Sequence, residues 1–202
     1  MITFEDIIKY LAEYDGEPLT IMEVCGTHTS EIAKNGIRSM LSPKIKLVSG
    51  PGCPVCVTVT EYVDKLCELA KRDGNVVVTF GDMIKVAGSS GSLYDTMAEG
   101  GRVKMVYSPF EIIDLANEDK SKTFIFAAVG FETTTPIYAM LIDAAVKNGI
   151  ENIKLLTSLK TMPPAIEWVC VQNHNISGFI SPGHVAAITG SNLFKPISLK
   201  YK

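Results

Sequence analysis

The stretch that indicates the fold most clearly is TFIFAAVGFETTTP, residues 123–136. Residues 123–129 form an unbroken apolar run, which is typical of a strand buried on both faces of a parallel sheet. A polar loop follows, and Thr135–Pro136 then predicts the start of a helix that Gly149 closes. The stretch therefore indicates a strand, a loop and a helix of an α/β unit.

The same succession of strand and helix recurs on both sides of this stretch. Apolar runs predict further strands at residues 19–24, 45–48, 76–80, 103–107, 153–156 and 178–180. Amphipathic runs and capping residues predict helices that begin at Thr3, Glu31, Thr60, Ser108 and Pro163. Such alternation is typical of parallel sheets that helices cover on both faces.

Domain organisation is predicted from one polar segment, Asn117–Lys122, between an expected helix and an expected strand. We expect two α/β units, at 1–117 and 123–202. Each is expected to be a Rossmann-like open sheet covered by helices, and the two are expected to face each other across a cleft.

The composition of the 202 residues excludes several classes of protein. Apolar residues make up 47% and charged residues 20%, which is typical of a globular chain rather than a disordered one. Lys and Arg number 19 against 22 Asp and Glu, and no basic block occurs, so we expect no nucleic-acid partner. No phosphate-binding glycine motif, G-x-S-x-G or H-E-x-x-H occurs either.

The location of the protein is predicted from the absence of hydrophobic targeting segments and from its cysteines. No apolar run is long enough to span a membrane, and residues 1–17 lack the features of a signal peptide, so we expect no membrane partner. Five cysteines, an odd number, indicate a reduced and therefore cytoplasmic protein.

Polar and thiol-bearing residues directly follow the predicted strands. They are Cys25, Cys53, Cys56, Asp82, Glu132 and His184. Because ligands bind at the carboxyl ends of strands in open parallel sheets, we expect these loops to gather at one rim or at two facing rims.

The strongest local signal is Cys53-Pro-Val-Cys56, in which glycine and proline hold the backbone in a tight turn. Two thiols at this spacing can close a disulfide or grip one metal ion. Two cysteines buried in a turn are the alternative. Zinc would need further ligands, and no second C-x-x-C motif occurs.

A second signal is Cys25-Gly-Thr27-His28-Thr29, which places a thiol, an imidazole and two hydroxyls on one loop. A thiolate suits soft metals, and a neighbouring imidazole can orient or assist it. A Cys–His nucleophile pair and an ordinary polar loop are the alternatives.

Other candidates carry less weight in isolation. Glu132 is either an acid–base group or a helix-start charge, His184 is either a ligand or a helix-start residue, and Asp82 has no assigned role. We expect His174 in a solvated loop. We expect Cys67 and Cys170 in the core, because each lies among apolar residues.

Five motifs together resemble one family. They are MEVCGTHT at 22–29, GPGCPVC at 50–56, TFGDM at 79–83, GFETT at 130–134 and PGHV at 182–185. Their order and their positions after strands resemble the HypD-type hydrogenase maturation factors, from about Met22 to Asn192. One difference is Ala186, where that family often has Ser.

The resemblance implies a cytoplasmic assembly scaffold rather than a classical turnover enzyme. Such proteins hold iron while CN and CO ligands are installed to make the Fe(CN)2CO moiety of [NiFe]-hydrogenase. By resemblance, Cys25 is the iron-holding thiol, and Cys53 and Cys56 are a thiol redox pair. Thr27, His28 and Thr29 would line the iron site, and Glu132 and His184 would face the same cleft from the second unit. Asp82, in the TFGDM motif, would be a cofactor-binding residue.

The resemblance also implies partners, which are a HypC-type small chaperone that shares the iron and a HypE-type cyanide donor. It implies a [4Fe–4S] cluster as well, held by cysteines in a further region that these 202 residues do not contain. The second unit is therefore expected to be incomplete at its C-terminus. An independent thiol–disulfide oxidoreductase and an inactive truncated remnant are the alternatives.

Overall fold

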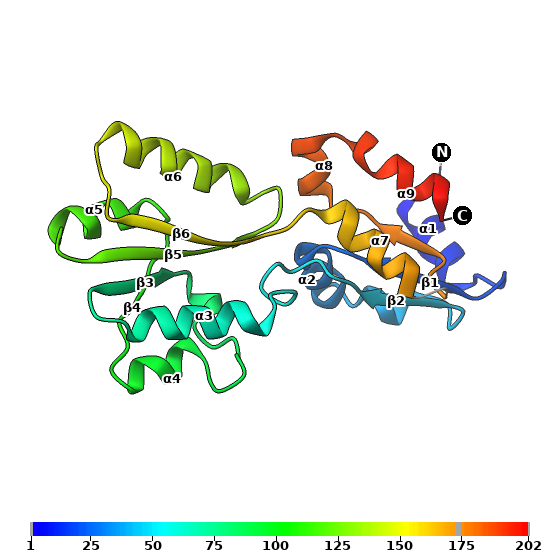
Figure 1. Ribbon diagram of the computed structural model, residues 1–202. Coiled ribbons are helices and arrows are strands. Elements are labelled where there is room, and N and C mark those ends of the chain that lie inside the picture. The colour runs from blue at the N-terminus through cyan, green and yellow to red at the C-terminus, as the bar shows by residue number, and fades with distance from the viewer. Residues whose placement is uncertain (1, 173–174, 202) are drawn as a thin grey trace. The chain divides into compact units, whose positions relative to one another are not determined.

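The computed structural model describes residues 2–172 and 175–201, and His174 lies outside them. Within the described residues, strands alternate with helices and all strand pairs are parallel. The strands form one sheet of three and one sheet of four (Figure 1). The predicted α/β class, with two parallel sheets flanked by helices, is confirmed.

The chain divides into two compact units, and it passes through the first of them twice. Unit 1 consists of residues 1–53 and 161–202, and unit 2 consists of residues 54–160. The last strand of the chain therefore joins the sheet that the first strand began.

This division corrects the boundary expected at 117–122. That segment connects α5 (Glu111–Glu118) to β5 (Thr123–Gly130), and both elements belong to unit 2. β5 pairs with β3 (Asn75–Thr79), which precedes the expected boundary. The polar composition at 117–122 marks only a short loop between elements of one sheet, because composition does not reveal which strands pair.

Unit 1 has the strand order β2-β1-β7. Its strands are β1 (Leu19–Glu23), β2 (Ile45–Ser49) and β7 (Gly178–Ile180). Its helices are α1 (Phe4–Ala12), α2 (Gly26–Lys34), α7 (Met162–Gln172), α8 (Gly183–Thr189) and α9 (Lys195–Lys200), with 3-10 turns η1 (Ile37–Met40) and η3 (Ser191–Phe194).

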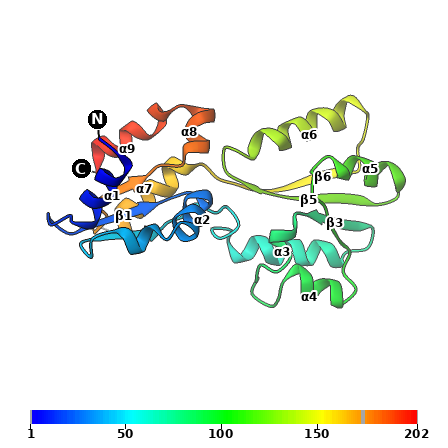
Figure 2. The ribbon, with the colours of Figure 1, turned by 180° about the vertical axis from the view of Figure 1, so that it is seen from behind.

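Helices lie on both faces of this sheet. α7 is in front of the strands in Figure 1, whereas α2 is in front of them in the opposite view of Figure 2. Right-handed crossovers account for this arrangement. The chain moves from β1 to one neighbouring strand through α2 and later reaches the other neighbour through α7, so the two helices fall on opposite faces.

Unit 2 has the strand order β4-β3-β5-β6. Its remaining strands are β4 (Val103–Met105) and β6 (Ile153–Leu159), and its remaining helices are α3 (Thr60–Lys71), α4 (Leu93–Ala98), α6 (Thr135–Lys147) and the 3-10 turn η2 (Gly81–Met83). α5 connects β4 to β5, and α6 connects β5 to β6.

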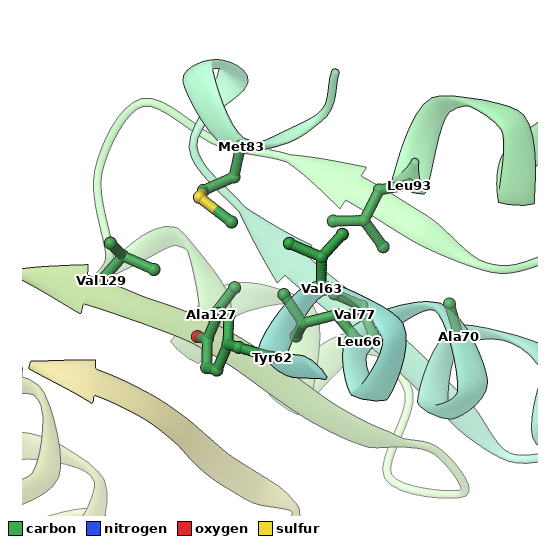
Figure 3. Packing of buried hydrophobic residues seen from close by; sticks show 9 residues of the cluster. All are labelled: Tyr62, Val63, Leu66, Ala70, Val77, Met83, Leu93, Ala127 and Val129. Atoms are coloured by element: carbon green, nitrogen blue, oxygen red, sulfur yellow. The ribbon is translucent and has the colours of Figure 1, made fainter. Parts of the chain in front are cut away.

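The core of unit 2 lies on both faces of β5, as its unbroken apolar sequence predicts. Phe124, Phe126 and Ala128 point to one face, where they pack with residues of α5 and α6. Ala127 and Val129 point to the other face. Figure 3 shows the cluster that they complete with Tyr62, Val63, Leu66, Ala70, Val77, Met83 and Leu93. Each cluster lies wholly within residues 54–160, so unit 2 has a core of its own.

Helix starts agree with the sequence at some positions and differ at others. Thr3 caps α1 in a reciprocal pair with Asp6, as predicted. α3 begins at Thr60, but its N-cap is Val59. α5 begins at Glu111, and the predicted cap Ser108 instead donates its backbone N–H to the Glu111 carboxylate at 2.7 Å.

Candidate functional site

Three strand ends meet at one edge of the unit 1 sheet. Glu23 at the end of β1 is paired with Ser49 of β2 and with Ile180 of β7, so the three parallel strands end at the same level. The loops that follow carry Cys25, Cys53 and His184. The structure therefore places in unit 1 three of the six candidate residues that follow predicted strands.

Cys25 is the N-cap residue of α2 and has an extended backbone, with φ −151° and ψ 124°. Its thiol is free and half-buried, and it makes no capping hydrogen bond to the helix. The N-terminus of a helix carries partial positive charge from its unpaired N–H groups. The thiol thus lies at a position that favours negatively charged groups.

α2 begins at Gly26, five residues before the start expected from the sequence. Glycine and threonine are weak helix formers, so the early start needs support from outside the helix. Glu23 of β1 supplies it by binding Thr29, whose backbone N–H makes the first bond of the helix to the Cys25 carbonyl at 3.1 Å. The Thr29 hydroxyl donates to Glu23 Oε1 at 2.6 Å.

Glu23 is a residue of the candidate site that the sequence analysis missed. Its side chain is buried, with 1% exposed, and its second oxygen, Oε2, accepts the backbone N–H of Cys25 at 3.2 Å. The carboxylate therefore binds both ends of the Cys25–Thr29 turn. A carboxylate at the end of the apolar run 19–24 is the signal that could have revealed it.

Gly52 brings the Cys53 loop against the Cys25 loop. A Cβ atom on residue 52 would lie 2.3 Å from the backbone nitrogen of Cys25 and 2.7 Å from its Cα, so glycine alone fits there. The backbone N–H of Gly50 also donates to the Glu23 carbonyl at 2.8 Å. The two cysteine-bearing loops of unit 1 are thus packed backbone against backbone.

His28 and Thr27 lie in the first turn of α2 with different exposure. His28 is half-buried, and its Nδ1 atom is buried without a hydrogen-bond partner among the residues that the structure describes. Thr27 is exposed. An enclosed imidazole nitrogen that lacks a protein partner suits a site that a ligand completes. Thr29, by contrast, uses its hydroxyl to hold Glu23.

His184 is exposed at the second residue of α8, directly after β7 and the buried Pro182. Its loop shares the sheet edge with the Cys25 loop through the pairing of β7 with β1. The structure therefore places His184 in unit 1 with Cys25, not in the second unit as expected, because β7 pairs with β1.

The other candidates belong to unit 2. Asp82 is exposed in η2 after β3, and Glu132 is half-buried after β5. Because β3 and β5 are neighbours, these two acids also follow adjacent strand ends. Burial, and then the charge of Asp82, raises the pKa of the Tyr138 phenol to about 12, and this phenol donates to the Val129 carbonyl at 3.0 Å.

The C-x-x-C pair spans the boundary between the units. Cys53 is the last residue of the first segment of unit 1, and the exposed Cys56 lies in the turn that opens unit 2. The Thr58 hydroxyl closes this turn by donating to the Pro54 carbonyl at 2.9 Å.

Cys170 is a core residue, as predicted, whereas Cys67 is half-buried beside the core. Cys67 packs against the α3 side of the unit 2 core, and Cys170 is buried on α7. Burial raises the pKa of the Cys170 thiol, so the chemically reactive thiolate form is disfavoured there.

The described chain offers few side chains that could bind a metal ion together. Among the described residues, no group of three or more His, Cys, Asp or Glu side chains is arranged to hold a metal ion. Nor does any helix in the described ranges have the length and apolarity needed to cross a membrane.

Two parallel-sheet units, one of which carries thiol and imidazole groups at its strand ends, define a thiol-bearing α/β protein. Comparison with known protein families shows to which family within this class the chain belongs. A family described as "HypD: Hydrogenase formation hypA family" matches residues 3–202. The chain belongs to the HypD family, which confirms the resemblance seen in its motifs.

Individual relatives are similar over nearly the whole chain. A Methanocaldococcus jannaschii protein named for hydrogenase expression and formation is 40% identical over 197 residues, covering 98% of this chain and 54% of the relative. The hydrogenase maturation factor HypD of Azotobacter vinelandii is 37% identical, covering 90% of this chain and 50% of the relative. HypD of Escherichia coli K12 is 36% identical, covering 95% and 51%. The chain thus spans about half the length of these relatives.

Proposed function

We propose that the chain acts in hydrogenase maturation by holding an iron atom on Cys25 while cyanide and carbon monoxide ligands are installed. The iron is cargo, destined for the Fe(CN)2CO moiety of [NiFe]-hydrogenase. Membership of the HypD family and the names of the relatives support the general role. The arrangement around Cys25 supports the specific one.

The observation that carries the proposal is the setting of the Cys25 thiol. It is half-buried at the start of α2, and the Glu23 carboxylate and the Gly52 backbone hold its loop from two sides. The neighbouring His28 has a buried nitrogen without a partner in the described chain. A thiolate is the soft donor that low-spin iron with strong-field ligands requires.

The lack of a three-ligand cluster in the described chain supports a shared site. Iron on Cys25 then needs donors from outside the chain. In the proposal, a HypC-type small chaperone supplies a second thiolate, and a HypE-type partner delivers cyanide. The diatomic ligands complete the coordination.

Cys53 and Cys56 serve in the proposal as a dithiol that stores two electrons. Glu132 is the proposed acid–base group, and Asp82 and His184 are proposed to bind the incoming groups. A [4Fe–4S] cluster does not fit the described residues. It takes four cysteine ligands, whereas Cys67 of this chain packs against the core of unit 2 and Cys170 is buried in unit 1.

Anaerobic iron reconstitution tests the proposal. The chain is mixed with Fe²⁺ and a HypC-type chaperone, and iron is measured in the isolated complex. We expect about one iron per chain for the wild type and for Cys67→Ala, and little for Cys25→Ala. Undiminished iron in Cys25→Ala contradicts the proposal. A wild-type complex without iron also contradicts it, and that result supports an inactive remnant.

The exposed Cys56 thiol favours a second candidate function, an independent thiol–disulfide oxidoreductase. The two functions make different demands on Cys25, which only the scaffold needs. A reduction assay on a disulfide-bonded protein substrate separates them. Activity that depends on Cys53 and Cys56 but not on Cys25 favours the oxidoreductase.

A further inference from the structure

Glu23 carries a further inference because it is the one charged residue among the buried polar side chains of the described chain. The others are Ser42, Thr79, Ser92 and Thr96. Burying an ionised carboxylate is costly unless it is paired or fully hydrogen-bonded. Glu23 nevertheless forms no ion pair with a described Lys, Arg or His, so another feature must account for its place.

The Glu23 carboxylate accepts two hydrogen bonds from the Cys25–Thr29 turn. Oε2 accepts the Cys25 N–H at 3.2 Å, and Oε1 accepts the Thr29 hydroxyl at 2.6 Å. These donors lie at the two ends of the first turn of α2. The carboxylate thus acts as a clamp that fixes the backbone from which the Cys25 thiol projects.

The clamp alone does not require a charge. A glutamine at residue 23 could accept the Cys25 N–H with its carbonyl oxygen and donate its amide to the Thr29 oxygen. A carboxylate adds a negative charge beside the residue proposed to hold a cation. Groups that lie behind a metal ligand orient that ligand and tune the affinity of the site.

We infer that Glu23 is a positioning residue for Cys25, which clamps its turn and supplies the negative charge that iron needs behind the thiolate. The charge part of this inference rests on the proposed iron-holding function. The clamp part does not, because it concerns the Cys25 turn alone. The two parts are tested with different variants.

Glu23→Gln tests the charge, with Glu31→Gln as the matched control. Glu31 is an exposed acid on α2, the helix that follows Cys25. Fe²⁺ is titrated anaerobically into each chain in the presence of the HypC-type chaperone. We expect Glu23→Gln to bind iron about 10- to 100-fold more weakly than wild type and Glu31→Gln to match wild type. Equal affinity in Glu23→Gln and wild type overturns the charge role.

Thr29→Val tests the clamp without iron. It removes the hydroxyl, whereas Thr29→Ser keeps it. The alkylation rate of Cys25 is measured by peptide-resolved mass spectrometry, with Cys56 of the same molecule as the internal standard. Loss of one hydrogen bond should loosen the turn and speed alkylation about fivefold in Thr29→Val, and Thr29→Ser should restore the slow rate. Equal rates in the two variants overturn the clamp.

The two readouts also separate failure of this inference from failure of the proposed function. A wild-type chain that binds no iron contradicts the proposed function and with it the charge role of Glu23. The alkylation rates then still decide the clamp. Melting temperatures show whether Thr29→Val or Glu23→Gln has lost its fold. If one of them has, the other still tests its own part of the inference, the clamp for Thr29→Val and the charge for Glu23→Gln.

Discussion

Gly52 lies directly against Cys25, with room for no side-chain atom between their backbones. A Cβ atom at residue 52 would be 2.3 Å from the Cys25 nitrogen. This contact packs the loop after β2 onto the loop after β1, and it is backbone on both sides. Neither side can give way as the tip of a flexible side chain would.

Gly52→Ala should therefore destabilise the chain, by about 1–3 kcal/mol in the free energy of unfolding. Urea denaturation measures the change. Gly183→Ala is the control, because a Cβ atom there would meet nothing within 4 Å. Alanine in place of that helical glycine should be neutral or stabilising by up to about 1 kcal/mol. Equal stability of Gly52→Ala and wild type would show that the loops are not in contact.

Cys53 and Cys56 should form a reversible disulfide, since their spacing permits closure within a turn. Thiol counting in redox buffers of increasing oxidising strength measures it. The chain has five cysteines, so we expect five thiols to fall to three in the wild type, whereas the four thiols of Cys53→Ser should stay at four under mild oxidation. Five free thiols in the wild type at strongly oxidising poise would exclude the redox pair.

Unit 2 should fold by itself, because residues 54–160 contain both faces of its sheet and both core clusters. We expect a polypeptide of these residues to unfold cooperatively in urea. A polypeptide of residues 1–117 should not, since β3 would lack its partner β5. A folded 1–117 together with an unfolded 54–160 would restore the division that the sequence suggested.

Stability at alkaline pH should depend on Tyr138, which is 2% exposed. Burial raises its folded-state pKa to about 12 from an unfolded value of 10.0. The folded chain thus keeps this proton between pH 10 and 12 whereas the unfolded chain releases it. The resulting stability is complete below pH 10 and is lost as the pH rises towards 12.

Tyr138→Phe should remove this part of the pH dependence, which amounts to as much as about 1.4 kcal/mol per pH unit. It should also lower stability at pH 8 by about 1 kcal/mol, since the hydrogen bond to Val129 is lost. Unfolding free energies at pH 8 to 11 give both values. Tyr107→Phe, at an 86% exposed position, should follow wild type. An unchanged slope in Tyr138→Phe would contradict the assignment.

The strands and their order of appearance could be predicted from the sequence, because short unbroken apolar runs such as 123–129, bounded by polar loops, are typical of strands covered on both faces. The placement of Cys25, Cys53 and His184 after strands was predictable for the same reason. The sequence predicts that such loops gather at one rim or at two facing rims, but not that His184 joins Cys25 and Cys53 in unit 1, because that depends on β7 pairing with β1 across more than a hundred residues.

Two local features could not be predicted from the sequence either. The early start of α2 depends on Glu23, which lies outside the helix and is brought to it by the end of β1. The helix propensities of residues 26–29 do not reveal that contact. Glu23 itself looks like an ordinary polar strand end until its burial is known.

The central claim, that Cys25 holds the iron to which diatomic ligands are attached, is tested most directly by infrared spectroscopy. The chain and its small chaperone are purified anaerobically from cells that contain the cyanide-supplying proteins. We expect CN and CO stretching bands in the wild-type complex and in Cys67→Ala, and their loss in Cys25→Ala with the chaperone still bound. Bands of undiminished intensity in Cys25→Ala would contradict the account.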